Sequence, residues 1–237
     1  MYIASDITQA VSQEWLQAWE AEQGLRLPDS YSQFIQTFGP GTYRGLLQVE
    51  LPDEDRLREF ADYELWEHPE EGPITREQIR DCCVLASTID GDFIAVSRHV
   101  EGLLWFPRHA DEIRVLSVMK GDFTQSMDHW LGAFYPQADP ERYYEPWQEQ
   151  GQHEFYLMDA EKGALKSFAE TLRATFAPEL CVENEYTCKL FYRAIGGYVR
   201  FNYAYGREVA VSYALPGELL SNITSMVVEH GGERASE

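Results

Sequence analysis

Hydrophobic residues change their spacing along the first part of the chain. They recur at helical intervals in residues 11–19 and again in residues 31–38, whereas in residues 47–51 they alternate with polar residues. The first spacing predicts amphipathic helices, and the alternation predicts a half-buried strand. A chain that opens with two helices and continues with strands is expected to form an α+β fold.

The two predicted helices are flanked by residues that start and stop helices. Asp6 and Gln9 stand where a capping box would precede the first helix, and Gly24 ends it. Pro28 opens the second helix at a position that tolerates a missing N–H group, and Gly39 closes it. Both helices are therefore bounded within the first 40 residues.

A β-hairpin is predicted further along. Residues 83–88 and 92–97 are rich in strand-forming residues and flank Asp90 and Gly91, a pair that suits a type I′ turn. This hairpin makes a mainly antiparallel sheet the expected core of the unit. Its other predicted elements are an acidic helix in 53–66 with Leu57, Phe60, Ala61 and Leu65 facing inward, strands in 103–106 and 113–118, and a helix in 123–134.

Composition changes in residues 136–152, which are rich in Pro, Gln and acidic residues. We predict a linker there, with one α+β unit in 1–135, a smaller one in 153–230 and a disordered tail in 231–237. The elements expected in the second unit are a strand in 155–158, a helix in 165–172, strands near 190–195, 198–205 and 209–213, and a last helix after Pro216.

Acidic residues greatly outnumber basic ones. The chain has 19 Lys and Arg against 40 Asp and Glu, a formal net charge of −21. Divided at residue 135, the charge is 10 − 24 = −14 before and 9 − 16 = −7 after. No cluster of basic residues is visible, so direct binding to nucleic acid is disfavoured. Such a field attracts a basic protein, although it also has the simpler effect of keeping the protein soluble.

Catalytic and metal-binding patterns are weak in this sequence. The cysteines, Cys82, Cys83, Cys181 and Cys188, lack zinc-ligand spacing and are expected to be reduced, packed thiols. His109, Asp111 and Glu112 are the best candidates for a metal or acid–base cluster. They are close together in the sequence, and we interpret them as residues of one solvated loop. Asp90 and Asp92 are explained by the hairpin, with Asp92 on an exposed strand. We therefore expect no enzymatic activity, no cofactor and no metal.

Three stretches resemble the SMI1/KNR4 (SUKH) group over roughly residues 8–135. They are residues 19–41, which contain Gly24-Leu25-x-Leu27-Pro28-x-x-Tyr31-x-x-Phe34-Ile35, residues 86–94 around Asp90-Gly91, and residues 123–131. The resemblance implies a mainly antiparallel sheet flanked by helices. It also implies a bacterial immunity protein that binds and neutralises a toxin, or alternatively an interaction scaffold or regulator with no toxin partner. An acidic insertion in 53–77 and the C-terminal unit depart from the group.

The acidic insertion is our candidate partner-binding surface. Its carboxylates would meet the basic groove of a toxin, for example a nuclease, with aromatic residues buried at the centre of the contact. The alternative is a merely solvated face. The candidate residues are Asp53, Glu54, Asp55, Glu59, Trp66, Glu67, Glu70, Glu71 and Tyr43. The N-terminus lacks a signal-peptide pattern, and no stretch is long enough to span a membrane, so a cytoplasmic location is expected.

Overall fold

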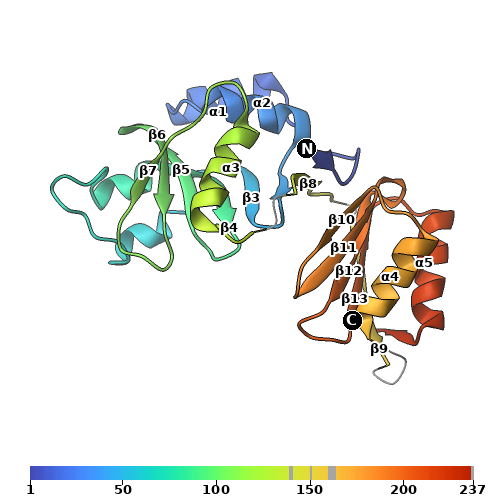
Figure 1. Ribbon diagram of the computed structural model, residues 1–237. Helices are drawn as coiled ribbons and strands as arrows, with labels where there is room; N and C mark the ends of the chain where they lie inside the picture. The colour runs from blue at the N-terminus through green and yellow to red at the C-terminus, as the bar shows by residue number, and fades with distance from the viewer. Residues whose placement is uncertain (139–140, 150, 160–163, 236–237) are drawn as a thin grey trace. The chain divides into compact units, whose positions relative to one another are not determined.

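The computed structural model describes residues 1–138, 141–149, 151–159 and 164–235. The chain forms two compact units (Figure 1). One consists of residues 9–138, and the other combines residues 139–237 with residues 1–8. Each unit combines helices with a mostly antiparallel sheet, so the α+β prediction is confirmed.

Six strands of the first unit form a continuous antiparallel sheet in the order β2-β3-β4-β5-β6-β7. The strands are β2 (Gly41–Tyr43), β3 (Leu47–Asp53), β4 (Cys82–Thr88), β5 (Phe93–Ser97), β6 (Val100–Phe106) and β7 (Arg114–Leu116). The helices are α1 (Gln13–Gln23), α2 (Asp29–Phe38) and α3 (Phe123–Phe134), with the 3₁₀ turns η1 (Glu59–Asp62) and η2 (Glu77–Asp81) between β3 and β4.

Both faces of this sheet are covered. On one face, Phe134 of α3 stacks on Trp105 of β6, and Phe123 of α3 packs edge-on against Tyr31 of α2. On the other face, the segment that contains η1 and η2 covers β4, β5 and β6. The buried residues that this segment and the sheet contribute to one cluster, which we call the insertion core, are Leu57, Ala61, Trp66, Ile74, Ile79, Cys82, Val84, Ala95, Leu104, Phe106 and Ile113.

The helix boundaries follow local hydrogen bonds. Helix α1 begins at Gln13 because the Ser12 hydroxyl accepts the backbone N–H of Trp15 at 3.2 Å, so the predicted cap at Asp6 is wrong. Helix α2 ends at Gly39, as predicted. Gly39 has φ +66°, and a Cβ there would lie 2.6 Å from the backbone of Gln9, so this position requires glycine.

The predicted β4–β5 hairpin is present, but its turn differs from the expected type. A type I′ turn needs positive φ at both central residues, and Gly91 has φ +89° whereas Asp90 does not. The N–H of Gly91 bonds to the carbonyl of Thr88, as in a type I turn followed by a left-handed glycine. Asp92 is buried rather than exposed, because its carboxylate accepts bonds from the Thr88 hydroxyl and the Arg108 backbone N–H.

The predicted acidic helix in residues 53–66 is absent. The Asp53 carboxylate accepts the backbone N–H groups of Asp55 and Arg56, a local turn that competes with helix formation. Only the short η1 follows. Leu65, which the helix would have turned inward, is 47% exposed. Repulsion between neighbouring carboxylates also disfavours a continuous helix here.

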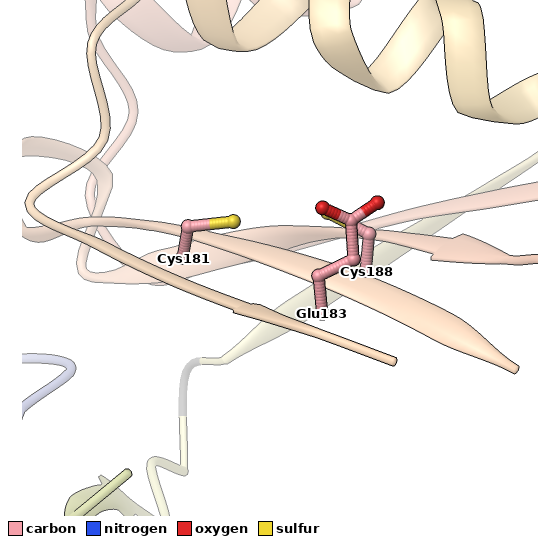
Figure 2. Close-up of side chains that lie close together, drawn as sticks. All are labelled: Cys181, Glu183 and Cys188. Carbon is pink, nitrogen blue, oxygen red and sulfur yellow. The ribbon is translucent and has the colours of Figure 1, made fainter. Parts of the chain in front are cut away.

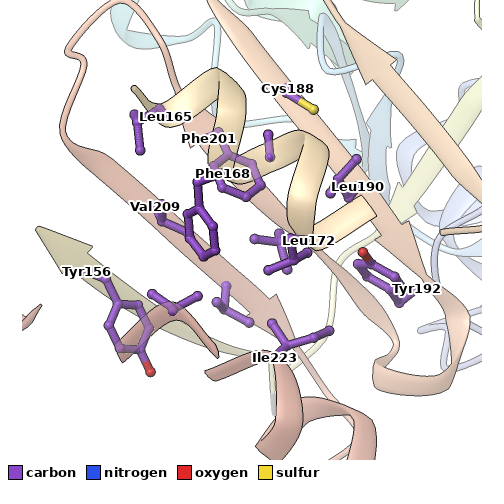
Figure 3. Close-up of a cluster of buried hydrophobic side chains, with 14 of the residues drawn as sticks. Tyr156, Leu165, Phe168, Leu172, Cys188, Leu190, Tyr192, Phe201, Val209 and Ile223 are labelled. Carbon is purple, nitrogen blue, oxygen red and sulfur yellow. The ribbon is translucent and has the colours of Figure 1, made fainter. Parts of the chain in front are cut away.

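The second unit is a sheet in the order β10-β11-β12-β13-β9-β14 with two helices on one face (Figures 1 and 3). Leu172 and Ile223 come from the two helices and pack on Leu190, Phe201 and Val209 of the sheet. The strands are β9 (Gln152–Met158), β10 (Leu180–Glu183), β11 (Thr187–Tyr192), β12 (Gly197–Asn202), β13 (Glu208–Tyr213) and β14 (Gly232–Arg234). The helices are α4 (Leu165–Thr175) and α5 (Glu218–Glu229), with the 3₁₀ turn η4 (Arg193–Ile195) before β12.

Two segments for which no strand was predicted contain strands. In the predicted linker, β8 (Tyr143–Pro146) pairs in parallel with β1 (Tyr2–Ile3), and Glu145 forms an ion pair with Lys189 at 2.7 Å. In the predicted disordered tail, β14 pairs with the free edge of β9. Residues 139–140, 150 and 236–237 of these segments lie outside the described residues.

Candidate partner-binding surface

The first acidic residues of the insertion are held by local contacts. Asp53 caps the turn after β3, and its second carboxylate oxygen lies 3.6 Å from Arg56 Nε. Glu54 accepts a hydrogen bond from the side-chain amide of Gln23 at 3.4 Å. Asp55 forms an exposed ion pair with Arg58 at 2.5 Å. These candidate residues therefore stabilise the start of the insertion.

Two arginines near η2 neutralise acids near η1. Arg80 forms an ion pair with Asp62, and Arg76 forms one with Glu64 at 3.1 Å. Arg76 also donates to the backbone carbonyls of Ala61 and Asp62. The two 3₁₀ turns are thereby joined by charged groups, which offsets part of the repulsion expected from the sequence.

Four of the candidate glutamates, all of them exposed, have no such partner. Within the described part of the chain, no Lys, Arg or His nitrogen is recorded within 4.0 Å of their carboxylates. We call Glu59, Glu67, Glu70 and Glu71 the four exposed glutamates. The backbone N–H of Glu67 bonds to the carbonyl of Asp111 at 2.8 Å, and Glu67 forms a β-bridge with Glu112. Acidic residues from two segments consequently lie beside each other.

The two aromatic candidates belong to the core. Trp66 is 7% exposed, packs against Phe106, and donates its indole N–H to the carbonyl of Pro107 at 2.7 Å. Tyr43 is fully buried and donates its hydroxyl hydrogen to Asp128 at 2.7 Å. The expectation that these rings would meet a partner is not supported, because both are already packed inside the unit.

Two other side chains of the insertion present apolar surface. Tyr63 is 61% exposed and Leu65 is 47% exposed. Tyr63 follows η1 directly, and its ring lies 6.5 Å from that of Phe60 at the edge of the insertion core. The predicted helix placed Leu65 inward, and no pattern in the sequence singled out Tyr63. They lie between Glu59 and Glu67, so this part of the surface is mixed apolar and acidic.

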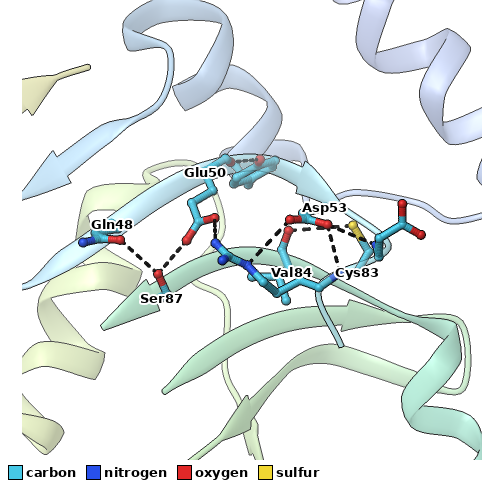
Figure 4. Close-up of polar contacts among 9 residues, drawn as sticks. Gln48, Glu50, Asp53, Cys83, Val84 and Ser87 are labelled. Atoms are coloured by element: carbon cyan, nitrogen blue, oxygen red, sulfur yellow. Dashed lines mark hydrogen bonds and ion pairs between the residues drawn. The ribbon is translucent and has the colours of Figure 1, made fainter. Parts of the chain in front are cut away.

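Another acidic residue of this region, Glu50, is buried. Strand β3 has a bulge between Val49 and Asp53, where Glu50 is buried and Leu51, which was expected to face inward, is only partly buried. Its carboxylate accepts hydrogen bonds from Arg56 at 2.7 Å and from the Ser87 hydroxyl at 2.5 Å, and the bond to Ser87 can be followed in Figure 4. Because each carboxylate oxygen of Glu50 accepts a hydrogen bond, this buried charge is satisfied within the protein and contributes to folding.

The groups considered for catalysis do not converge. His109, Asp111 and Glu112 are exposed on one loop, and Asp92 is occupied by structural hydrogen bonds. Burial raises the pKa of Cys82 to about 12, which keeps that thiol protonated and unreactive at neutral pH. Among the described residues of this unit, these groups therefore do not form one assembled set.

Comparison with known proteins identifies the first unit. The SMI1 / KNR4 family (SUKH-1) matches residues 10–125, which contain the whole insertion. No curated protein and no solved structure matches the chain. Among the helices of the described residues, none has the length and apolar character needed to cross a membrane. Residues 10–125 thus belong to the SMI1/KNR4 (SUKH) superfamily, as the sequence resemblance indicated.

Proposed function

We propose that this protein is a bacterial immunity protein that binds a cognate toxin in the cytoplasm and neutralises it by stoichiometric occlusion, without catalysis. The observation that carries the proposal is the presence of the four exposed glutamates, together with Tyr63 and Leu65, on a SUKH domain. Immunity to a toxin is a role that membership of this superfamily implies.

The charge of this surface favours a basic partner. Unpaired carboxylates retain their full field toward solvent, and such a field speeds the encounter with a protein of opposite charge. Enzymes that act on nucleic acids carry basic grooves, so a nuclease toxin fits this surface. A carboxylate row in that groove would occupy the positions of substrate phosphates and exclude the substrate.

Apolar contacts would then hold the complex together. Exposed Tyr is enriched among residues that dominate binding energy, and Tyr63 lies between the glutamates in sequence. Charge would act mainly on association, and Tyr63 with Leu65 mainly on dissociation. The association rate would therefore depend on the glutamates, and the dissociation rate on the apolar side chains.

The test begins with the neighbouring gene, because an immunity protein is expected directly downstream of a large secreted protein with a variable C-terminal domain. That domain, expressed alone, should arrest growth, and co-expression of this protein should restore it. The two purified proteins should form a 1:1 complex. A neighbour that is harmless, or a toxin that remains active in the complex, would argue for an interaction scaffold instead.

A further inference from the structure

Two cysteines and a glutamate converge on one face of the second unit. In the β10–β11 ladder, Glu183 lies opposite Cys188, and Cys181 is two residues before Glu183 on the same face of β10. The two Sγ atoms and a carboxylate oxygen of Glu183 all lie within 4.8 Å of one another. Figure 2 shows the Cys181 thiol and the Glu183 carboxylate both directed toward Cys188.

The surroundings of this cluster are polar on one side and apolar on the other. Cys188 is 1% exposed and belongs to the core under α4, whereas Glu183 is exposed, so the cluster is accessible from solvent. The Tyr203 hydroxyl donates to the Glu183 carboxylate at 2.7 Å. Arg173 of α4 lies 3.7 Å from the Cys181 sulfur and 3.6 Å from the Glu183 carboxylate.

We propose that Cys181, Glu183 and Cys188 bind one zinc ion. Thiolate sulfur and carboxylate oxygen are ordinary zinc ligands, at about 2.3 Å and about 2.0–2.2 Å from the metal. Tetrahedral ligands at these lengths are roughly 3.5–4 Å apart. The three ligand atoms need to close by about 1 Å from their 4.8 Å limit, which side-chain rotation provides. The exposed side leaves room for water as the fourth ligand.

The charges around the cluster suit a divalent cation. Two thiolates and a carboxylate carry three negative charges, so the zinc complex would have a net charge of −1, and the adjacent Arg173 guanidinium offsets it. Tyr203 acts from outside as a positioning residue, because its hydrogen bond fixes Oε1 of Glu183, while Oε2 lies 3.6 Å from Arg173. Within the described residues, this is the group of His, Cys, Asp and Glu side chains whose ligand atoms converge in this way.

Zinc at this place would fasten the edge of the sheet. Strand β10 is the outermost strand of its sheet and has four residues. A metal that binds Cys181 and Glu183 of β10 together with Cys188 of β11 closes the ladder between them. The site is independent of the proposed partner-binding surface, which belongs to the other unit.

Cobalt(II) titration of the reduced full-length protein tests the proposal, because thiolate ligands give Co²⁺ an intense near-ultraviolet charge-transfer band. We expect this band, the visible bands of tetrahedral cobalt, saturation at one equivalent, and displacement by Zn²⁺. Cys181→Ser and Cys188→Ser should each remove the charge-transfer intensity of one sulfur and weaken binding at least tenfold. Cys82→Ala, a buried thiol of the other unit, is the matched control and should titrate like the wild type.

Two further variants keep the test informative if Cys188→Ser fails to fold. Glu183 is exposed, so Glu183→Gln should leave the metal-free melting temperature unchanged and weaken cobalt binding at least tenfold. Tyr203→Phe should weaken cobalt binding about 10-fold while the charge-transfer band remains, because the variant loses the hydrogen bond that positions Glu183 but keeps both sulfur ligands. The proposal is overturned if the reduced wild type gives no charge-transfer band, or if Glu183→Gln and Cys181→Ser both bind cobalt as tightly as the wild type does.

Discussion

The first unit contains two kinds of carboxylate, and their surroundings differ completely. Glu50 is 7% exposed, and each of its carboxylate oxygens accepts a hydrogen bond, from Arg56 and from Ser87. The four exposed glutamates lie further along the chain, between residues 59 and 71, in contact with solvent and without a cation partner among the described residues. Residue type and sequence position are similar, yet only the second group retains a field that a partner can use.

The same contrast holds for the aromatic residues of the insertion. Trp66 closes the insertion core and satisfies its N–H on a backbone carbonyl, whereas Tyr63 leaves most of its ring in water. A buried residue contributes to the free energy of folding, and an exposed one is free to contribute to binding. The insertion is therefore a folded layer with its own core, and its outer side is exposed to solvent.

The largest effect that we expect is the loss of stability in Trp66→Ala. Removing a core Trp should cost about 3–5 kcal/mol in the free energy of unfolding, whereas Tyr63→Ala should cost less than about 1 kcal/mol. Denaturant unfolding of both variants measures this difference directly. A stable Trp66→Ala variant that no longer binds its partner would restore the original expectation that Trp66 belongs to the binding surface.

The buried and exposed carboxylates should differ by a smaller amount. Glu50→Ala leaves Arg56 and Ser87 without their shared acceptor, so it should reduce the free energy of unfolding by about 2–3 kcal/mol. Asp55→Ala removes a solvent-exposed ion pair with Arg58 and should change it by less than about 1 kcal/mol. If the two variants lose equal amounts of unfolding free energy in the same denaturant experiment, the two kinds of carboxylate do not differ in their contribution to stability.

A binding experiment tests whether Tyr63, unlike the buried Trp66, contacts the partner. In a complex with the cognate toxin, Tyr63→Ala should weaken affinity by about 2 kcal/mol, mostly through faster dissociation. Surface plasmon resonance resolves the two rates. Tyr186 is similarly exposed on the second unit, at 60%, and Tyr186→Ala is the matched control. If both alanine variants dissociate at the wild-type rate, Tyr63 is outside the contact.

Much of the fold could be predicted from the sequence, because its signals are local. The spacing of apolar residues placed α2, α3, α4 and the β4–β5 strands, and Gly39 marked the end of α2. Strands β10 and β14 escaped prediction because each has only three or four residues and depends on pairing with a distant partner strand. The prediction of an acidic helix was wrong because the Asp53 carboxylate binds the backbone N–H groups of Asp55 and Arg56. These bonds form a turn in place of the first helical turn.

The candidate surface was less predictable than the fold. Its acidic character follows from composition, but which carboxylates have partners depends on Arg76 and Arg80, which approach only in the folded chain. The cysteines illustrate the same limit. Cys82 and Cys83 are adjacent in sequence and point to opposite faces of β4, whereas Cys181 and Cys188 are seven residues apart and converge through the register of β10 and β11.

The association rate with the cognate toxin domain tests the central claim most directly. The variant for this test changes all four exposed glutamates to Lys. The control reverses four other exposed glutamates, so that the net charge changes equally. These control residues are Glu22, Glu101, Glu170 and Glu229. Neither change should unfold the protein, because exposed charges each contribute little to stability.

Stopped-flow mixing at low and high salt measures the rates. At low salt, the variant of the four exposed glutamates should associate about 10-fold or more slowly than the control variant. The difference should shrink at 1 M salt, where the Debye length falls to roughly 3 Å. Equal association rates of the two variants at low salt would contradict the account, because the acidic insertion would then not be the surface that meets the toxin.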